Sequence, residues 1–403
     1  MRKLSFIAAA SLLVLPAVSQ AKPLNELLAE KSGVLGGKES APAKVTYNDG
    51  LKMDFGNASL AANVGLQTLF TVNDFDNKSG DPRADNTSFD VRNTRLELAG
   101  ETLDGEFSWL VTNDFGSFNT ESDDEGSTLL DAVFNWHVCE EYGFRMGQYK
   151  TPSGLQWNVP YWSLQFIDTA RVTQAFNLGR EAGVGFFGKV GDVGMHEVGV
   201  FNGLSNVGGV QEGENTGGLD NKVIGVYGIS FDLAGDYDRS YEGDPMNTSD
   251  FAATMGASAY YGQAEGDAGD VDQYGATVDF ALRSAGASFQ AEGFYGASSF
   301  DDNLPSGEDS VDNFGLYAQG GFFFNPAWEV AGRFGWISFD DEVGAALGGI
   351  DNEYEINAVV SYYLDGHNLK IQTGPTWVIS QLQDDTADDL TDFRYQLMVA
   401  GHM

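Results

Sequence analysis

The chain contains one long stretch with little strand character, which reads GFRMGQYKTPSGLQWNVPYWSLQFIDTARVTQAFNLGR from Gly143 to Arg180. Residues 143–150 are predicted to be a short strand, and the chain returns to a strand pattern at Arg180. The connection between them is rich in Trp, Tyr, Pro and Gln, and a connection of this length in a compact domain is usually functional. We therefore expect residues 152–179 to form a loop that folds into the lumen of a β-barrel and narrows its pore.

The N-terminus has the three parts of a secretory signal. Arg2 and Lys3 form the basic start, an apolar run follows from Phe6 to Val18, and small residues around Ala21 mark the cleavage site. The apolar run is too short to cross a bilayer as a helix. The sequence predicts, in chain order, a signal peptide at 1–21, a periplasmic N-terminal helix and linker at 22–50, and an outer-membrane β-barrel at 51–403.

The exported chain is strongly acidic. Removal of Arg2 and Lys3 from the 22 basic residues leaves 20 basic against 59 acidic residues, a net charge of −39. This charge argues against nucleic acid or an anionic surface as a partner bound through a basic face. Cys139 is the only cysteine, which excludes an intramolecular disulfide and a cysteine metal cluster. An export signal without disulfides fits a periplasmic or outer-membrane address.

From Leu60 onward the chain shows alternating apolar and polar residues in segments separated by Gly, Asn, Asp and Ser. The period of two predicts sixteen strands, and many are long enough for a tilted strand to cross a bilayer. The predicted strands are 60–75, 89–103, 105–116, 127–138, 143–151, 180–191, 195–204, 222–234, 251–264, 272–284, 286–300, 312–325, 328–340, 353–365, 369–383 and 392–403.

The alternation assigns one apolar face to the lipid and one polar face to the lumen. In the segment 127–138 the apolar set includes Leu130 and Phe134, and the polar set includes Asp131. In the segment 353–365, Glu355, Asn357 and Ser361 share the polar face. A soluble sandwich with one wet face would give the same alternation.

The lengths of the connections separate these two folds, because bacterial barrels have short periplasmic turns and longer outer loops. With both ends of the barrel in the periplasm, long and short connections alternate along the chain. The exception is the connection from Gly235 to Asp250, which is long on the periplasmic side and is interpreted as a periplasmic insertion. The predicted outer loops are 76–88, 117–126, 152–179, 205–221, 265–271, 301–311, 341–352 and 384–391. The sequence thus predicts an all-β fold, a sixteen-stranded antiparallel transmembrane β-barrel whose third outer loop folds inward.

The outer loops carry acidic clusters at 121–125, 301–302, 340–342 and 384–389. Carboxylate oxygens suit hard divalent cations, but a solvated and mutually repelling surface is the simpler interpretation. The expected partners are therefore outer-membrane lipids and lipopolysaccharide, with divalent cations bridging at these loops as a weaker expectation. No metal site and no cofactor are predicted.

Several motifs in the first half of the barrel resemble one family. Residues 147–154, GQYKTPSG, resemble the G-Q-[FY]-K-x-P-x-G signature of the phosphate-selective porin O and P family. Four other pieces match in order, VRNTRLELAG at 91–100, NDF at 113–115, FIDTAR at 166–171 and GVFNG at 199–203. The resemblance implies a trimeric, sixteen-stranded outer-membrane porin in a Gram-negative bacterium. Family members that select phosphate line the pore densely with Arg and Lys, and this chain is poor in both.

The size and charge of the narrowest part of a pore decide what passes. The candidate pore residues, which lie around the third outer loop or on lumen-facing strand positions, are Arg95, Arg145, Lys150, Asp168, Arg171, Arg180, Glu181, Arg283 and Arg333. One hypothesis is a basic wall that faces an acidic loop across the pore. The alternative is that Arg171 and Arg180 pair with Asp168 and Glu181 to hold the loop in place. Arg92 shares the parity of Leu96 and is expected at the level of the lipid headgroups.

No catalytic residues are predicted. The four histidines are scattered, and no HExxH, GxSxG or paired-cysteine motif is present. The sequence predicts a passive, water-filled channel for small hydrophilic solutes and ions, with inorganic anions such as phosphate among the candidates. A second hypothesis is a plugged barrel that serves as an adhesin or a surface receptor. The two hypotheses differ in whether residues 152–179 lie inside the barrel or outside it.

Overall fold

The computed structural model describes residues 44–47, 50–75, 85–116, 128–203, 220–245, 250–266, 269–300, 309–384 and 388–403. The predicted signal peptide at 1–21 and most of the predicted periplasmic segment at 22–50 lie outside these residues. The predicted acidic clusters at 121–125 and 301–302 also lie outside them. Within the described part of the chain, no helix has the length and apolar content needed to cross a membrane.

The described residues form strands almost throughout, with four short helical turns. The strands are β1 (Lys44–Tyr47), β2 (Leu51–Asp54), β3 (Ala58–Asp74), β4 (Asn86–Thr102), β5 (Phe107–Asp114), β6 (Thr128–His137), β7 (Tyr142–Lys150), β8 (Arg180–Val190), β9 (Gly194–Phe201), β10 (Asp220–Ala234), β11 (Ala252–Gly266), β12 (Gly269–Ser284), β13 (Ala287–Phe300), β14 (Ser310–Asn325), β15 (Trp328–Ser338), β16 (Ile350–Asp365), β17 (Leu369–Leu382) and β18 (Leu390–His402). The helical turns are η3 (Gln156–Asn158), η4 (Tyr161–Ser163), α3 (Arg171–Phe176) and α4 (Asp341–Ala346).

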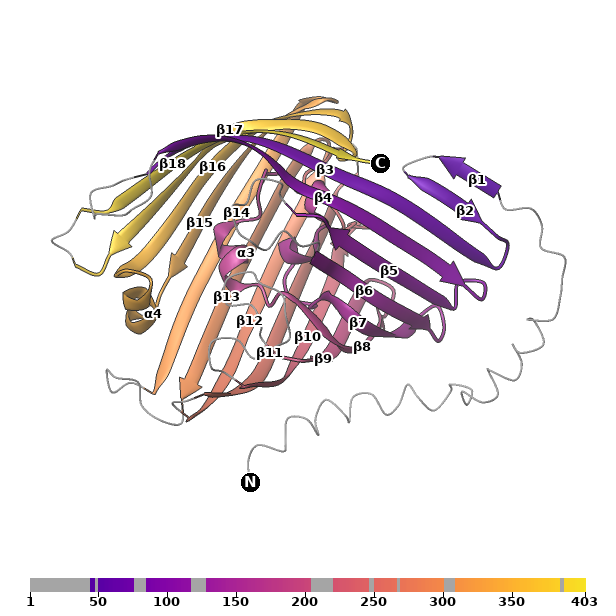
Figure 1. The fold of residues 1–403 in the computed structure, drawn as a ribbon, viewed down its shortest axis with the longest axis horizontal. Helices are drawn as coiled ribbons and strands as arrows, with labels where there is room; N and C mark the ends of the chain where they lie inside the picture. The colour runs from indigo at the N-terminus through magenta and orange to yellow at the C-terminus, as the bar shows by residue number, and fades with distance from the viewer. Residues whose placement is uncertain are drawn as a thin grey trace.

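Strands β3 to β18 form a closed antiparallel barrel (Figure 1). Each strand pairs with its neighbour in the sequence, and the last strand returns to the first. In this closing pair Phe393 lies opposite Asp74, and His402 lies opposite Gly65. The predicted sixteen-stranded antiparallel barrel is therefore confirmed. Closure satisfies the backbone hydrogen bonds of both edges, which a sheet in a bilayer requires.

A hairpin of β1 and β2 extends the sheet where β18 ends. Strand β2 pairs with the first part of β3, with Leu51 opposite Ala62 and Asp54 opposite Ser59. It therefore covers backbone groups of β3 that β18 is too short to reach. The sequence assigned residues up to 50 to a helix and linker, and this is wrong for Lys44–Tyr47, which pair with β2 as strand β1.

The two faces of each strand follow the predicted alternation. On β12, Val278 is 60% exposed on the outer face, whereas Asp279 beside it is 7% exposed on the lumen face. On β16, Ile356 is exposed and Glu355 and Asn357 are buried. Apolar side chains thus face the lipid, and the polar side chains of the lumen face are buried among one another and against the chain that fills the barrel.

Two β-bulges reverse this alternation locally, because each inserts one extra residue into its strand. In β4 the partner changes from Gln67 opposite Asn93 to Thr68 opposite Val91, so Arg92 is the extra residue. The expectation that Arg92 lies at the lipid headgroups is wrong, because its guanidinium donates to the carbonyl oxygen of Ile167 inside the barrel at 3.1 Å. In β6 the extra residue is Leu130, which is buried at 6% exposure instead of facing lipid.

The connection between β10 and β11 also differs from its predicted role. Its described residues 235–245 do not stand apart as a periplasmic insertion, because Tyr237, Glu242 and Asp244 are 6%, 1% and 0% exposed. Tyr237 packs with Leu155, Ala252 and Ala281 in one apolar cluster. The connection thus folds back against the inner wall of the barrel. We refer to residues 235–245 as the inner connection.

Candidate functional site

The candidate site is built around residues 151–179, which we call loop 151–179. Its two ends are clamped together, because the backbone N–H and the side-chain hydroxyl of Thr151 both donate to the carbonyl oxygen of Gly179, at 3.2 and 3.3 Å. Lys150, the last residue of β7, then holds the first part of the loop. Its Nζ donates to the carbonyl oxygens of Trp157 and Val159 at 2.7 and 2.9 Å.

Two glycines of the 147–154 motif occupy positions where a side chain would clash with neighbouring atoms. Gly147 has φ +126°, and a Cβ there would lie 2.0 Å from the carbonyl oxygen of Ala132 on the neighbouring strand. Gly154 has φ +70°, and its Cβ would lie 2.7 Å from a carboxylate oxygen of Glu292. A side chain is therefore disfavoured at both positions. The motif lets the chain leave β7 and approach the opposite wall closely.

Beyond Gly154 the loop is held by lumen-facing carboxylates and amides of the later strands. The Glu292 carboxylate on β13 accepts from the backbone N–H of Leu155 at 2.9 Å and of Gln156 at 2.6 Å. Gln165 donates through Nε2 to Glu329 on β15 at 2.6 Å. These contacts span from β7 to β15, and residues of the loop such as Leu155 and Gln165 are 2% exposed.

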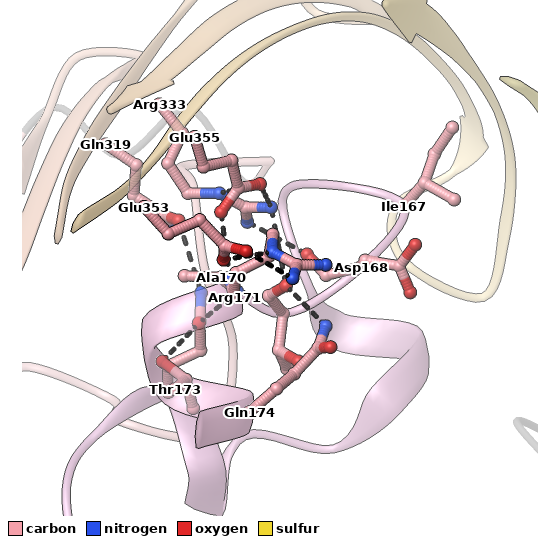
Figure 2. A network of polar contacts seen from close by, with 12 residues as sticks. Ile167, Asp168, Ala170, Arg171, Thr173, Gln174, Gln319, Arg333, Glu353 and Glu355 are labelled. Carbon is pink, nitrogen blue, oxygen red and sulfur yellow. Dashed lines mark hydrogen bonds and ion pairs between the residues drawn. The ribbon is translucent and has the colours of Figure 1, made fainter. Parts of the chain in front are cut away.

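The short helix α3 lies against β13, β14 and β15, and its first residue faces two carboxylates on β16 (Figures 1 and 2). The Arg171 guanidinium binds both oxygens of Glu353, at 2.5 and 2.7 Å, and the Arg171 N–H donates to Glu355 at 2.9 Å. Burial by itself lowers the pKa of Arg171, but the hydrogen bonds and the charge of Glu353 outweigh it and raise the pKa above its ordinary value.

Arg333 on β15 lies next to this pair in Figure 2. Its guanidinium is completely buried and pairs with Glu355 at 2.6 Å. It also donates to the carbonyl oxygen of Asp168 at 2.9 Å and lies over the ring of Phe166, 4.5 Å from the centroid. A bidentate or shared guanidinium fixes direction as well as distance, so Arg333 and Arg171 together fix residues 166–171 against the wall.

The opposite wall of the barrel contacts the same part of the loop. Arg92 in the β4 bulge pairs with Asp168. Arg95, three residues further along β4, pairs with Asp114 of β5 at 2.7 Å. Both guanidiniums lie over the ring of Tyr161, at 4.9 and 5.0 Å from its centroid. Residues 161–168 thus bridge from β4 to β15.

The structure brings Asp168, Arg171 and Arg333 together, and it places the other predicted site residues along the wall. Arg145 pairs with Glu197 at 3.0 Å, and Arg180 pairs with Asp131 at 2.9 Å. The alternative pairing of Arg171 and Arg180 with Asp168 and Glu181 is therefore not the one that forms. Glu181 is buried at 1% exposure, and Arg283 on β12 contacts the inner connection.

Sequence reasoning missed the acidic side of this site. Glu353, Glu292 and Glu329 hold the loop, yet the candidate set contained mainly basic residues. The signal was present, because the alternation in 353–365 already placed Glu355 on the lumen face. The alternation could not reveal which of the many acidic residues meet loop 151–179, because that depends on the path of the loop across the barrel.

A polar cavity remains open between loop 151–179 and the wall formed by β3, β4 and β16–β18. One part has a volume of about 500 Å³ and a second part about 530 Å³. The two parts share the lining residues Asn73, Asp168, Thr169, Gln174, Arg394 and Gln396. Arg171 and Glu353 line the first part and Arg92 the second. Ions that enter this cavity would therefore meet both signs of charge.

Within the described residues, no group of three or more His, Cys, Asp or Glu side chains is arranged to hold a metal ion. The acidic cluster at 340–342 instead caps a helix, because Asp340 accepts from the N–H of Glu342 at the start of α4.

Comparisons with known proteins support the same fold. The model of the family phosphate-selective porin O and P matches residues 63–223. The outer-membrane channel DcaP of Acinetobacter baumannii has a similar structure, with a TM-score of 0.62 at 15% identity, covering 87% of this chain and 99% of that one. An anion-selective porin from Comamonas acidovorans gives a TM-score of 0.59 at 12% identity, covering 85% and 99%. The trimer form of OmpT from Vibrio cholerae gives 0.54 at 10% identity, covering 85% and 99%. No curated protein sequence matches the chain.

Proposed function

We propose that this chain, which resembles the phosphate-selective porin O and P family over residues 63–223 and has the porin fold, is a passive channel in the outer membrane of a Gram-negative bacterium. It admits small hydrophilic solutes and ions. The family match and the fold point to a channel rather than an enzyme. The observation that carries the proposal is the polar cavity beside loop 151–179, which is lined by charged side chains inside a closed barrel.

Loop 151–179 is the constriction in this proposal. It crosses the lumen from β7 to β15 and leaves the cavity as the path past it. Guanidiniums and carboxylates both line this path, and Arg92, Arg171 and Arg333 beside the loop are paired with acids. We therefore propose weak ion selectivity and no high-affinity phosphate site, because a dense row of basic residues is missing.

The purified protein is expected to produce stepwise conductance in planar lipid bilayers. A water-filled path lined by charge carries ions at rates that single-channel recording resolves. In a trimer, one insertion adds three equal steps that close separately at high voltage. A folded protein that inserts without any conductance would contradict the channel and favour the plugged barrel of an adhesin or receptor.

The protein is proposed to be a homotrimer. Strands β5 to β9 have 8 to 11 residues and are shorter than most of the others. Their outer face carries exposed apolar side chains, among them Phe144, Val184 and Val200. Short strands with an apolar face suit contact with other subunits, because they need not match the full thickness of the lipid.

The trimer is expected to survive mild detergent and to run as a heat-resistant oligomer band in gels. Multi-angle light scattering in detergent, with the detergent mass subtracted, should give about three times the mass of one barrel. A single-barrel mass across the whole concentration range would contradict the trimer without affecting the barrel fold. We also propose that divalent cations at the acidic outer loops bind lipopolysaccharide.

A further inference from the structure

The inner connection, residues 235–245, contacts both the wall of the barrel and loop 151–179. Its contacts with the wall are numerous. The Arg283 guanidinium of β12 lies between the rings of Tyr237 and Tyr241, 3.8 and 3.9 Å from their centroids. Arg239 pairs with Asp279 of β12 at 2.9 Å. Cation–π contacts and buried ion pairs of this kind anchor a segment in one position.

The far end of the inner connection is tied to the next periplasmic turn. Asp244, completely buried, accepts from the N–H of Gly286 at 2.7 Å. The backbone of Glu242 is also held, because its carbonyl oxygen lies 3.0 Å from Nε2 of His367 in the turn between β16 and β17. The inner connection is thus fastened to β12 and to turns at two different places around the barrel, which gives it a fixed position in the lumen.

Glu242 projects from this fixed segment onto loop 151–179. One carboxylate oxygen accepts from the side chain of Gln156 at 2.8 Å, and the other accepts from the backbone N–H of Gln165 at 2.7 Å. The N–H of Glu242 donates to the carbonyl oxygen of Ser163 at 2.9 Å. The carboxylate therefore joins two points of the loop that are nine residues apart in the sequence.

Gln156 connects Glu242 to α3 through further hydrogen bonds. Its Oε1 accepts from the N–H of Ala170 and from the hydroxyl of Thr173, both at 2.8 Å. Since one amide group cannot turn around without losing these bonds, Glu242 fixes which way the Gln156 amide faces. The position of α3, whose first residue Arg171 lines the cavity, is in this way coupled to the inner connection.

We propose that the inner connection is a second, periplasmic element of the constriction and that Glu242 is the positioning residue that holds loop 151–179 in its conducting geometry. This inference rests on the proposed channel function and adds to it. The size of the pore is set from both ends of the barrel, by an outer loop and by an inner connection that meet at one carboxylate. Loss of the carboxylate releases the side chain of Gln156 and the N–H of Gln165 and lets this part of the loop move within the lumen.

Single-channel recording of Glu242→Ala and Glu242→Gln tests the inference. We expect Glu242→Ala to raise the mean conductance by roughly a factor of two and to add open-state noise and substates, because the width of the narrowest part changes. Glu242→Gln keeps one acceptor for the N–H of Gln165 but presents an amide N–H₂ to the N–H₂ of Gln156, so it is expected to show the noise with a smaller rise. Uptake of sugars of graded size by liposomes should show a higher size limit for Glu242→Ala.

Asp236→Asn is the matched control, because Asp236 lies in the same connection, carries the same charge and is exposed. It should record like the wild type. The mobility of the oligomer in gels should be the same for every variant as for the wild type. This measurement separates a loop that has moved from a barrel that is damaged. If Glu242→Ala fails to fold, the Gln variant carries the test alone.

If the wild type conducts and the Glu242 variants have the same conductance, noise and size limit, the role of Glu242 is overturned and the channel function stays intact. A wild-type protein that does not conduct would instead overturn the passive channel. If Glu242→Ala then conducts, the carboxylate holds a plug in place rather than a constriction.

Discussion

Replacement of Arg333 by alanine is expected to lower the free energy of unfolding by roughly 3–5 kcal/mol, because it leaves the buried carboxylate of Glu355 without its partner. The guanidinium is completely buried and Glu355 is 3% exposed. The same change removes the donor to the carbonyl oxygen of Asp168. Equilibrium unfolding in urea from lipid vesicles, followed by tryptophan fluorescence, measures the effect.

Two further variants show whether the unpaired charge is the cause. Arg333→Met combined with Glu355→Leu removes both charges and should recover most of the loss, because apolar residues of similar size can replace a buried pair. Arg145→Ala removes a pair whose guanidinium side is 30% exposed and should cost less than Arg333→Ala. Equal losses for Arg333→Ala and Arg145→Ala would show that burial of the Arg333 pair adds nothing.

The sequence is sufficient to predict the strands of the barrel, but it does not predict how the segments inside the lumen contact the wall. Period-two alternation predicts each of the sixteen strands, because every strand faces lipid on one side and the lumen on the other. It fails at Arg92 and Leu130, where one inserted residue reverses the faces, and a bulge has no clear signature in a single strand. The inserted residue becomes visible only when the register between the two paired strands is known.

The contents of the lumen depend on contacts between residues far apart in the sequence. Arg171 meets Glu353 and Gln156 meets Glu242, and neither pair has a fixed spacing that a motif could express. The inner connection is unusually long for a periplasmic turn, and this anomaly is visible in the sequence. Its acidic and aromatic residues gave no indication that they turn into the barrel, because Asp and Glu in a turn are usually solvated.

The second large effect is expected in ion selectivity at Arg171. Its guanidinium side chain is 43% exposed, lines the cavity and neutralises Glu353. Arg171→Ala leaves the charge of Glu353 in the path of the ions, so the channel should become more selective for cations. Glu353→Gln should act in the opposite direction, because it leaves the positive charge of Arg171 in the same place.

Reversal potentials in a tenfold KCl gradient measure both changes. Each variant should shift the potential, with opposite signs, by roughly a quarter of the ~59 mV that a tenfold gradient of one monovalent ion supplies.

Asp389→Asn is the control, because Asp389 is an exposed outer-loop acid and such charges are screened within about 8 Å at physiological salt. Charges in a narrow, partly desolvated path are screened less, so the constriction should dominate although the net charge of −39 of the exported chain, 20 basic against 59 acidic residues, lies mostly elsewhere. A shift for Asp389→Asn as large as for Arg171→Ala would place selectivity at the mouth of the channel, and strong anion selectivity with block by micromolar phosphate would contradict the proposed absence of a phosphate site.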